Sequence, residues 1–220
     1  MNLNRYIDHT LLAPQAYLKD IENLCREARE YGFYSVMVNP AYVSRAAQIL
    51  EGSDIKVGSV IGFPLGANRT DIKIAEAMAA ENDGADEIDI VANIGALMAG
   101  EFSVASDEFI RVKKAVSPSM ITKVIIETPL LGTDMLPEAV QAVIDSGADF
   151  VKSATGFFGA TPVEHILQMS NCSQGRIKVK AAGGIKTAEE AMAMIEAGAA
   201  RIGCSSSVPI IIDFEKSHKK

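Results

Sequence analysis

A lysine lies in the middle of a short β-prone segment, Phe150 to Gly156 (FVKSATG), whose other residues suit burial. Lysine is almost never fully buried without a compensating partner, and an apolar setting lowers its pKa from about 10.4. Only the neutral amine attacks a carbonyl carbon, so a lysine with a lowered pKa is a candidate nucleophile. The setting of Lys152 therefore predicts a Schiff base with a carbonyl substrate.

Charged residues also occur at alternate positions in neighbouring segments of the same kind. Because side chains of a strand alternate between its two faces, the apolar residues share one face and the charged residues share the other. The charged set comprises Glu87, Asp89, Lys123, Glu127, Lys152, Lys178 and Lys180. Lys180 could supply a cation that lowers the pKa of Lys152, and Asp89 could move protons through a water during imine chemistry.

Ion pairing is the simpler interpretation of these charges. For any single residue, a compensated pair in a polar layer is as good an explanation as catalysis. For the set it is weaker, because buried ion pairs often gain little net stability after desolvation. We therefore expect some of these residues to be catalytic.

The segments that carry these residues belong to a repeat. Short β-branched runs recur at Ile7, Val36, Val60, Ile90, Val124, Val151, Val179 and Ile202, each separated by enough chain for a loop and a helix. The helical patterns between them often end in glycine, and Thr187 with Glu190 fits a capping box. Eight such units predict an α/β fold, a (β/α)8 TIM barrel with a single domain over residues 1–220.

Two features qualify this fold prediction. A doubly wound open sheet is the structural alternative, and the last unit is the weakest because Pro209 and a β-branched run stand where the eighth helix should form.

In a barrel, inward charges near the carboxyl ends of strands lie where active sites are found. Lys152, Lys180 and Asp89 come late enough in their strands to qualify.

Small residues dominate the loops after the expected sixth, seventh and eighth strands. The loops after strands seven and eight are the usual phosphate site of a barrel, where backbone N–H groups and a helix N-terminus hold the anion. The candidate phosphate-binding residues are Thr155, Gly156, Gly183, Gly184, Gly203, Ser205 and Ser206. The expected substrate is a small phosphorylated carbonyl compound.

Composition excludes several classes of protein. A net charge of −7 argues against a broad nucleic-acid or anionic-membrane surface. The three cysteines, Cys25, Cys172 and Cys204, lack a CxxC pair and indicate free thiols in a reducing compartment. The chain has no signal-peptide pattern and no long apolar stretch, so we expect a cytoplasmic protein without nucleic-acid or membrane partners.

The histidines do not predict a metal site. His9, His165 and His218 share no HxH or HxxxH spacing, which disfavours a metal-dependent enzyme. We expect no metal and no other cofactor.

Eight motifs in order resemble the deoxyribose-phosphate aldolase family: IDHTLL, VNP, GFPLGAN, EIDIVANIGALMAG, KVIIET, DFVKSATGF, VKAAGGIKT and RIGCSS. The resemblance implies a cofactor-independent class I aldolase on a (β/α)8 barrel. Such an enzyme reversibly cleaves 2-deoxy-D-ribose 5-phosphate to D-glyceraldehyde 3-phosphate and acetaldehyde, in deoxyribonucleotide catabolism. The resemblance also suggests that the protein is a homodimer or homotetramer.

The resemblance implies roles for particular residues. Lys152 would form the imine, Lys180 would tune it, and Asp89 would be the proton-relay carboxylate. The glycines and serines named above would hold the phosphate. Asp8 and Thr10 would border the site, where the inward-facing Lys123 is also expected.

The chain departs from the family at several positions. The TGFFGAT segment is shorter than the family's glycine-rich stretch, which affects the shape of that lip. Met37 stands where many members have cysteine. Lys178 occupies a position where a small residue is common, and it could pair with Glu87 or add to the field on Lys180. The chain ends in Lys220, whereas some members end in a tyrosine that reaches the site.

Two other functions remain open from the sequence. A phosphosugar isomerase would need a glutamate or histidine base at a strand end, where this chain has mostly lysines. A catalytically inactive phosphosugar-binding barrel is favoured only by the shortened loop.

Overall fold

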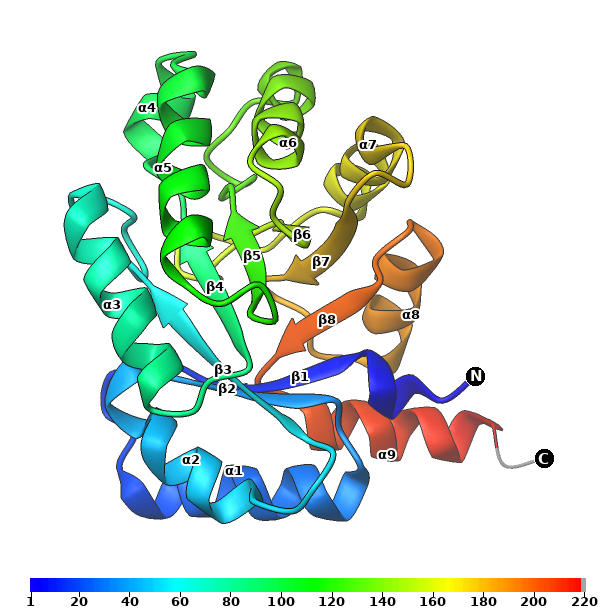
Figure 1. The fold of residues 1–220 in the computed structure, drawn as a ribbon. Coiled ribbons are helices and arrows are strands. Elements are labelled where there is room, and N and C mark those ends of the chain that lie inside the picture. Colours follow the sequence, from blue (N-terminus) through cyan, green and yellow to red (C-terminus); the bar gives the residue numbers. More distant parts are fainter. Residues whose placement is uncertain (219–220) are drawn as a thin grey trace.

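The computed structural model describes residues 1–218, which include a closed barrel of eight parallel strands. The strands are β1 (Ile7–Leu11), β2 (Ser35–Val38), β3 (Lys56–Ile61), β4 (Glu87–Val91), β5 (Ile121–Ile125), β6 (Phe150–Lys152), β7 (Lys178–Ala182) and β8 (Arg201–Cys204). Each strand pairs with the next, and β1 pairs with β8 to close the barrel (Figure 1). The predicted (β/α)8 TIM barrel is confirmed, and the open-sheet alternative is wrong.

Helices surround this barrel (Figure 1). They are α1 (Leu18–Tyr31), α2 (Val43–Leu50), α3 (Thr70–Asn82), α4 (Ile94–Met98), α5 (Phe102–Ala115), α6 (Leu136–Asp145), α7 (Val163–Ser173), α8 (Ala188–Glu196) and α9 (Ser207–His218). Short 3-10 helices span Leu3–Tyr6, Pro40–Tyr42 and Thr133–Met135. Helix α4 is an addition to the simple repeat, between β4 and α5. No helix in residues 1–218 is long and apolar enough to cross a membrane.

Local signals explain where two of the helices begin. The capping box predicted for α8 is present, because the Thr187 side chain accepts from the Glu190 N–H and the Glu190 carboxylate accepts from the Thr187 N–H. Helix α9 forms despite Pro209, which lies in its first turn, where no intrahelical N–H donor is needed. Ile210 and Ile211 of α9 are fully buried. Packing of this apolar face therefore stabilises a helix whose local sequence is a weak helix former.

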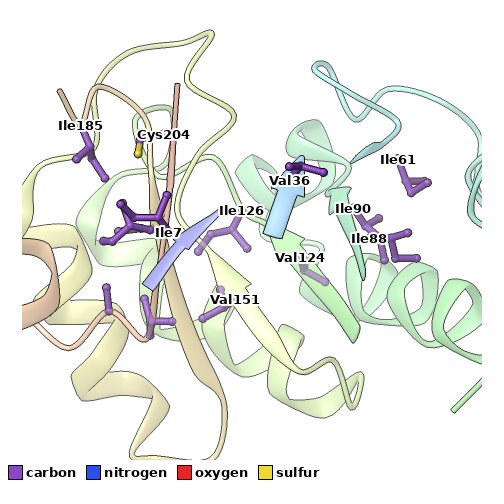
Figure 2. Close-up of a cluster of buried hydrophobic side chains, with 14 of the residues drawn as sticks. Ile7, Val36, Ile61, Ile88, Ile90, Val124, Ile126, Val151, Ile185 and Cys204 are labelled. Atoms are coloured by element: carbon purple, nitrogen blue, oxygen red, sulfur yellow. The ribbon is translucent and has the colours of Figure 1, made fainter. Parts of the chain in front are cut away.

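The apolar core lies between the barrel and the helices. Figure 2 shows Ile88 and Ile90 of β4, Val124 of β5 and Val151 of β6 among its buried side chains. These residues occupy the alternate positions that the sequence assigned to the helix-facing side. The charged residues between them consequently face the inside of the barrel.

Strand register places the inward charges at similar heights. Lys152 of β6 is the register partner of Lys180 of β7, and Asp89 of β4 is the partner of Lys123 of β5. Ile125 is the partner of Lys152. The barrel thereby gathers residues that are far apart in sequence, with Lys152 at the carboxyl end of β6 and the other three charged residues in the middle of their strands.

Candidate active site

Asp89 is at the centre of a buried ion-pair network inside the barrel. Its Oδ2 lies 2.7 Å from Lys152 Nζ and 2.7 Å from Lys180 Nζ. Its Oδ1 lies 2.9 Å from Lys123 Nζ. One carboxylate thus holds three ammonium groups, and the structure brings together the lysines and the aspartate that the sequence singled out.

Two further carboxylates complete the network. Asp8 lies 2.6 Å from Lys180 Nζ and 2.7 Å from an Arg201 nitrogen, and it accepts a hydrogen bond from Ser35 Oγ at 2.7 Å. Glu87 lies 2.7 Å from Lys123 Nζ and 3.6 Å from Arg201. Asp8 was expected to border the site, and it is a fully buried member of the network itself.

Arg201 is a member of this network that the sequence analysis missed. It is buried, and its guanidinium carbon stacks 3.4 Å from the centroid of the Tyr34 ring. The sequence contained a signal for its inward direction, since Arg201 alternates with the apolar Ile202 in β8 as Lys178 does with Val179 in β7. The same parity rule applied to the eighth strand finds it.

The network carries four cations and three carboxylates. Lys123, Lys180 and Arg201 each contact two of the carboxylates, whereas the structure gives Lys152 one ion-pair partner, Asp89. With all of these groups ionised, the cluster has one positive charge in excess. Loss of a proton from Lys152 neutralises the cluster and costs the fewest ion pairs.

Burial also favours the loss of a proton from Lys152. Burial lowers the pKa of Lys152 to about 8, opposed by Asp89 and assisted by the positive charge of Lys180. Burial alone would raise the pKa of Asp89, but Lys123, Lys152 and Lys180 hold it well below its usual range. Near neutral pH the site therefore combines a permanent carboxylate with a lysine that readily becomes a free amine.

A cavity of about 670 Å³ opens above this network. Its lining includes Thr10, Lys152, Thr155, Gly156, Gly183, Gly184, Gly203 and Ser205. Apart from Thr10 and Lys152, these are the predicted phosphate-binding residues; the one that is missing is Ser206, which is half-buried just before α9 and accepts a hydrogen bond from the Ile210 N–H. Lys152 is 4 % exposed and Lys180 is fully buried, so Lys152 is the lysine of the pair that a ligand can reach.

Two glycines shape the wall of the cavity after β7. Gly183 and Gly184 have φ values of 96° and 83°, in the left-handed region that favours glycine. A Cβ on Gly184 would lie 2.6 Å from Ala160 Cβ. The turn therefore packs its backbone closely against the loop that follows β6, just before the N-terminus of α8.

Known proteins match this chain along nearly its whole length. The model of the DeoC/LacD family aldolases matches residues 4–208. The chain belongs to the DeoC/LacD aldolase family. A deoxyribose-phosphate aldolase of Brevibacillus brevis is 48% identical over 212 residues, which cover 96% of each chain.

Solved structures of DeoC/LacD-type barrels agree with this assignment. An aldolase called QR15 is 42% identical, with a TM-score of 0.93 over 98% of this chain and 97% of that one. A tetrameric deoxyribose phosphate aldolase from Aeropyrum pernix is 33% identical, with a TM-score of 0.90 over 98% and 92%. The chain is thus an aldolase, a carbon–carbon lyase, and the predicted family resemblance is confirmed.

Two residues at the mouth of this DeoC/LacD barrel were given no role by the sequence, although Glu127 was expected to face inward. Lys186 lines the cavity two residues after Gly184, so it adds a positive charge at that end. Glu127 is fully buried after β5 and has a φ of 52°, an unusual conformation for a residue with a side chain. Its Oε2 accepts a hydrogen bond from the Thr155 N–H at 3.0 Å, and burial raises its pKa. The GGIK and IIET motifs contained both residues, but neither showed a role by spacing alone.

Some expectations for this aldolase need correction. Lys178 is exposed at the first position of β7, and its Nζ lies 5.5 Å from the centroid of the Phe150 ring. Pairing of Lys178 with Glu87 is wrong, because Glu87 pairs with Lys123 and Arg201. The parity was right, but Lys178 lies at the open amino-terminal end of the barrel, where water solvates its charge. Lys220 lies outside the described residues.

In residues 1–218, no three histidine, cysteine, aspartate or glutamate side chains are grouped so that they could hold a metal ion. His9 pairs with Glu27 and Ser207 instead, outside the barrel wall. Cys25, Cys172 and Cys204 are free thiols.

Proposed function

We propose that this aldolase reversibly cleaves 2-deoxy-D-ribose 5-phosphate to D-glyceraldehyde 3-phosphate and acetaldehyde, through a Schiff base on Lys152, in deoxyribonucleotide catabolism. The observation that carries the proposal is the state of Lys152. It lines the cavity, it has a single carboxylate partner in the network, and burial lowers its pKa to about 8. The names of the relatives support the choice of substrate.

The chemistry needs no group beyond the side chains and water. The Lys152 amine adds to the aldehyde carbon C1 of the open-chain sugar, and loss of water gives an iminium ion. The C3 hydroxyl then loses its proton while the C2–C3 bond breaks, and the electron pair moves toward the iminium nitrogen. D-glyceraldehyde 3-phosphate leaves, an enamine remains on Lys152, and protonation at C2 followed by hydrolysis releases acetaldehyde.

Lys180 and Asp89 would control the protons of these steps. Asp89 Oδ2 is 2.7 Å from both Nζ atoms, so it holds the two lysines at a fixed separation. The positive charge of Lys180 favours the neutral form of Lys152. We assign to Asp89 the relay of a proton between this pair and a cavity water, and to Lys123 and Asp8 the compensation of the surrounding charge.

The phosphate of the substrate would bind at the other end of the cavity. The backbone N–H groups of Gly156, Gly183 and Gly184, with Gly203 and Ser205, would surround it. Thr155 and Lys186 line this end, where Lys186 would add a direct charge. Ser206 would contribute from its position just before α9. Thr10 would border the sugar carbons between the two ends.

We also propose that residues 1–220 act as one aldolase domain in the cytoplasm, assembled as a homodimer or homotetramer. The tetrameric relative and the free thiols support these assignments. The partner of the chain is then a small phosphorylated sugar or aldehyde, with no nucleic acid or membrane involved.

Trapping of the imine tests the function. Borohydride with acetaldehyde or deoxyribose 5-phosphate should add a covalent mass to the intact protein. The adduct should disappear in Lys152→Ala and persist in the matched Lys178→Ala, which removes an exposed lysine from the opposite end of the barrel. No adduct under conditions where the sugar phosphate binds would overturn the mechanism and favour the isomerase or the inactive barrel.

A further inference from the structure

A chain of hydrogen bonds on the outer side of the barrel wall ends at the expected phosphate loop. His9 of β1 has its Nε2 2.9 Å from Glu27 Oε2 of α1 and its Nδ1 3.0 Å from Ser207 Oγ of α9. Ser207 Oγ donates in turn to the Cys204 carbonyl at 3.0 Å. Ser205 and Ser206 lie between Cys204 and Ser207, so these hydrogen bonds fix the turn that joins β8 to α9.

The order of glutamate, histidine and serine is that of a hydrolytic triad, but this group cannot act as one. Ser207 is fully buried and His9 is 4 % exposed, so no substrate carbonyl reaches the serine oxygen. Neither residue lines the cavity. Their effect on a ligand must therefore pass through the loop that they hold.

The number of available hydrogens allows two arrangements of the hydrogen bonds between His9, Ser207 and Cys204. A serine hydroxyl has one hydrogen, so Ser207 can donate either to the Cys204 carbonyl or to an unprotonated His9 Nδ1. If His9 is neutral and its Nε2–H donates to Glu27, its Nδ1 requires the Ser207 hydrogen, and the Cys204 carbonyl loses that bond. If His9 is protonated, both ring nitrogens donate, and Ser207 remains free to close the turn onto Cys204.

We propose that His9 is a positioning residue for the phosphate end of the cavity, and that its protonation selects the closed form of the Gly203–Ser206 turn. This inference rests on the proposed function, since it assumes that the turn binds the substrate phosphate. A dianion at the turn favours a cation behind it, and the cation favours the hydrogen bonds that hold the turn. Phosphate binding and protonation of His9 therefore strengthen each other.

The surroundings of His9 determine the direction of the pH dependence. Burial lowers the pKa of His9, opposed by Glu27. Cys204 faces it from β8 as a neutral thiol, because burial raises the pKa of that group to about 11. The Phe33 ring packs 4.9 Å away, while Asp8 points to the opposite face of β1. Affinity for the phosphate should be highest below the pKa of His9 and should fall as the pH rises through it.

The experiment compares KM for deoxyribose 5-phosphate with KM for unphosphorylated 2-deoxyribose between about pH 5.5 and 8, in wild type and His9→Asn. The asparagine amide can donate to Ser207 at every pH but does not titrate. The preference for the phosphorylated sugar should fall about fivefold more in wild type than in His9→Asn as the pH rises. Comparing the two enzymes cancels the ionisation of the substrate phosphate, whose second pKa is about 6.

Three further variants sharpen the comparison. His165→Asn is the matched control on α7 and should keep the wild-type profile. Ser207→Ala should raise KM for the phosphorylated sugar at all pH values and leave KM for deoxyribose unchanged. Glu27→Gln removes the carboxylate that favours the cation, so it should move the change in preference to lower pH.

Identical pH profiles in wild type and His9→Asn would overturn the inference, as would equal losses with both sugars in Ser207→Ala. Borohydride trapping with acetaldehyde separates these results from failure of the proposed function. If the imine forms in every variant but the phosphate preference does not depend on His9, the positioning role alone is wrong. If no imine forms in wild type, the proposed function is wrong.

Discussion

At the scale of single residues, Lys152 differs from its neighbours in how many carboxylates hold it. Lys123 bridges Glu87 and Asp89, and Lys180 bridges Asp8 and Asp89. Burial alone would lower the pKa of Lys123, but Asp89 and Glu87 raise it above the usual range. Lys152 has the least compensation and lines the cavity, so one interior supports both a permanent ammonium group at Lys123 and a reactive amine.

The pH dependence of imine formation tests this difference. Trapping of acetaldehyde on Lys152 should accelerate as the pH rises toward about 8, where the free amine becomes the main form, and then level off. In Lys180→Met the loss of a neighbouring positive charge should raise the pKa of Lys152 by about one unit or more. The measurement is the initial rate of adduct formation, by mass spectrometry, across pH. An unchanged midpoint in Lys180→Met would contradict the electrostatic role of that lysine.

Stability should distinguish Lys152 from Lys123. In Lys152→Met, Asp89 keeps Lys123 and Lys180, so the free energy of unfolding should fall by less than about 1 kcal/mol or even rise. In Lys123→Met, Glu87 is left with Arg201 at 3.6 Å, and the loss should be about 3–5 kcal/mol. Urea unfolding followed by circular dichroism measures both. Equal losses would mean that Lys152 is held for structure as much as for chemistry.

At the scale of elements, the connections after the strands determine the shape of the cavity. Glu127, two residues beyond β5, reaches the backbone of Thr155 beyond β6 and joins two neighbouring loops. It does so in a left-handed conformation that costs about 1 kcal/mol or more for a non-glycine residue. Such strain persists where the surrounding structure requires it, and here it places a carboxylate beside the loop that carries Thr155 and Gly156.

A pair of variants isolates the contribution of this contact. Glu127→Gln keeps an oxygen for the Thr155 N–H, whereas Glu127→Ala leaves that donor without a partner, and both retain the strained φ. We expect Glu127→Ala to lose about 1–2 kcal/mol of stability and a larger share of kcat/KM than Glu127→Gln. Thermal unfolding and steady-state kinetics measure the two effects. Equal kinetics in the two variants would show that the hydrogen bond does not shape the site.

At the scale of the whole molecule, the barrel separates two kinds of interior. The helix-facing sides of the strands supply the apolar core, and the inside of the barrel supplies the charges. Because the hydrophobic core lies outside the barrel, the interior can hold costly buried charges without reducing the apolar area that stabilises the fold. The active site therefore uses a region from which the fold gains little apolar burial.

The number of chains in the assembled protein can be predicted and measured. Light scattering of the full chain at micromolar concentration should give two or four times the mass of one chain, in agreement with the tetrameric relative. A single-chain mass over the whole concentration range would contradict the proposed homodimer or homotetramer. Kinetics at the same concentrations would then show whether the monomer is active.

The amino-acid sequence by itself determined the repeated strand-and-helix units, which favour a barrel, and the inward direction of Lys152, Lys180 and Asp89. These properties follow from periodicity within single segments, since alternation along a strand and spacing along a helix are local. The sequence did not predict that α9 forms across Pro209, because packing of Ile210 and Ile211 overrides the weak local propensity.

Only the tertiary structure decided which cation belongs to which carboxylate. Parity gives the direction of a side chain but not its depth along the barrel axis, which the register between strands determines. For this reason Lys178 lies exposed at the open end, while Arg201, one strand away, is buried between Asp8 and Glu87. Barrel closure fixes the height of every strand relative to its neighbours, so Lys152 and Lys180 stand side by side as register partners. Lys152 ends β6 and lines the cavity, whereas Lys180 lies in the middle of β7 and is fully buried, because the residues that follow it cover it.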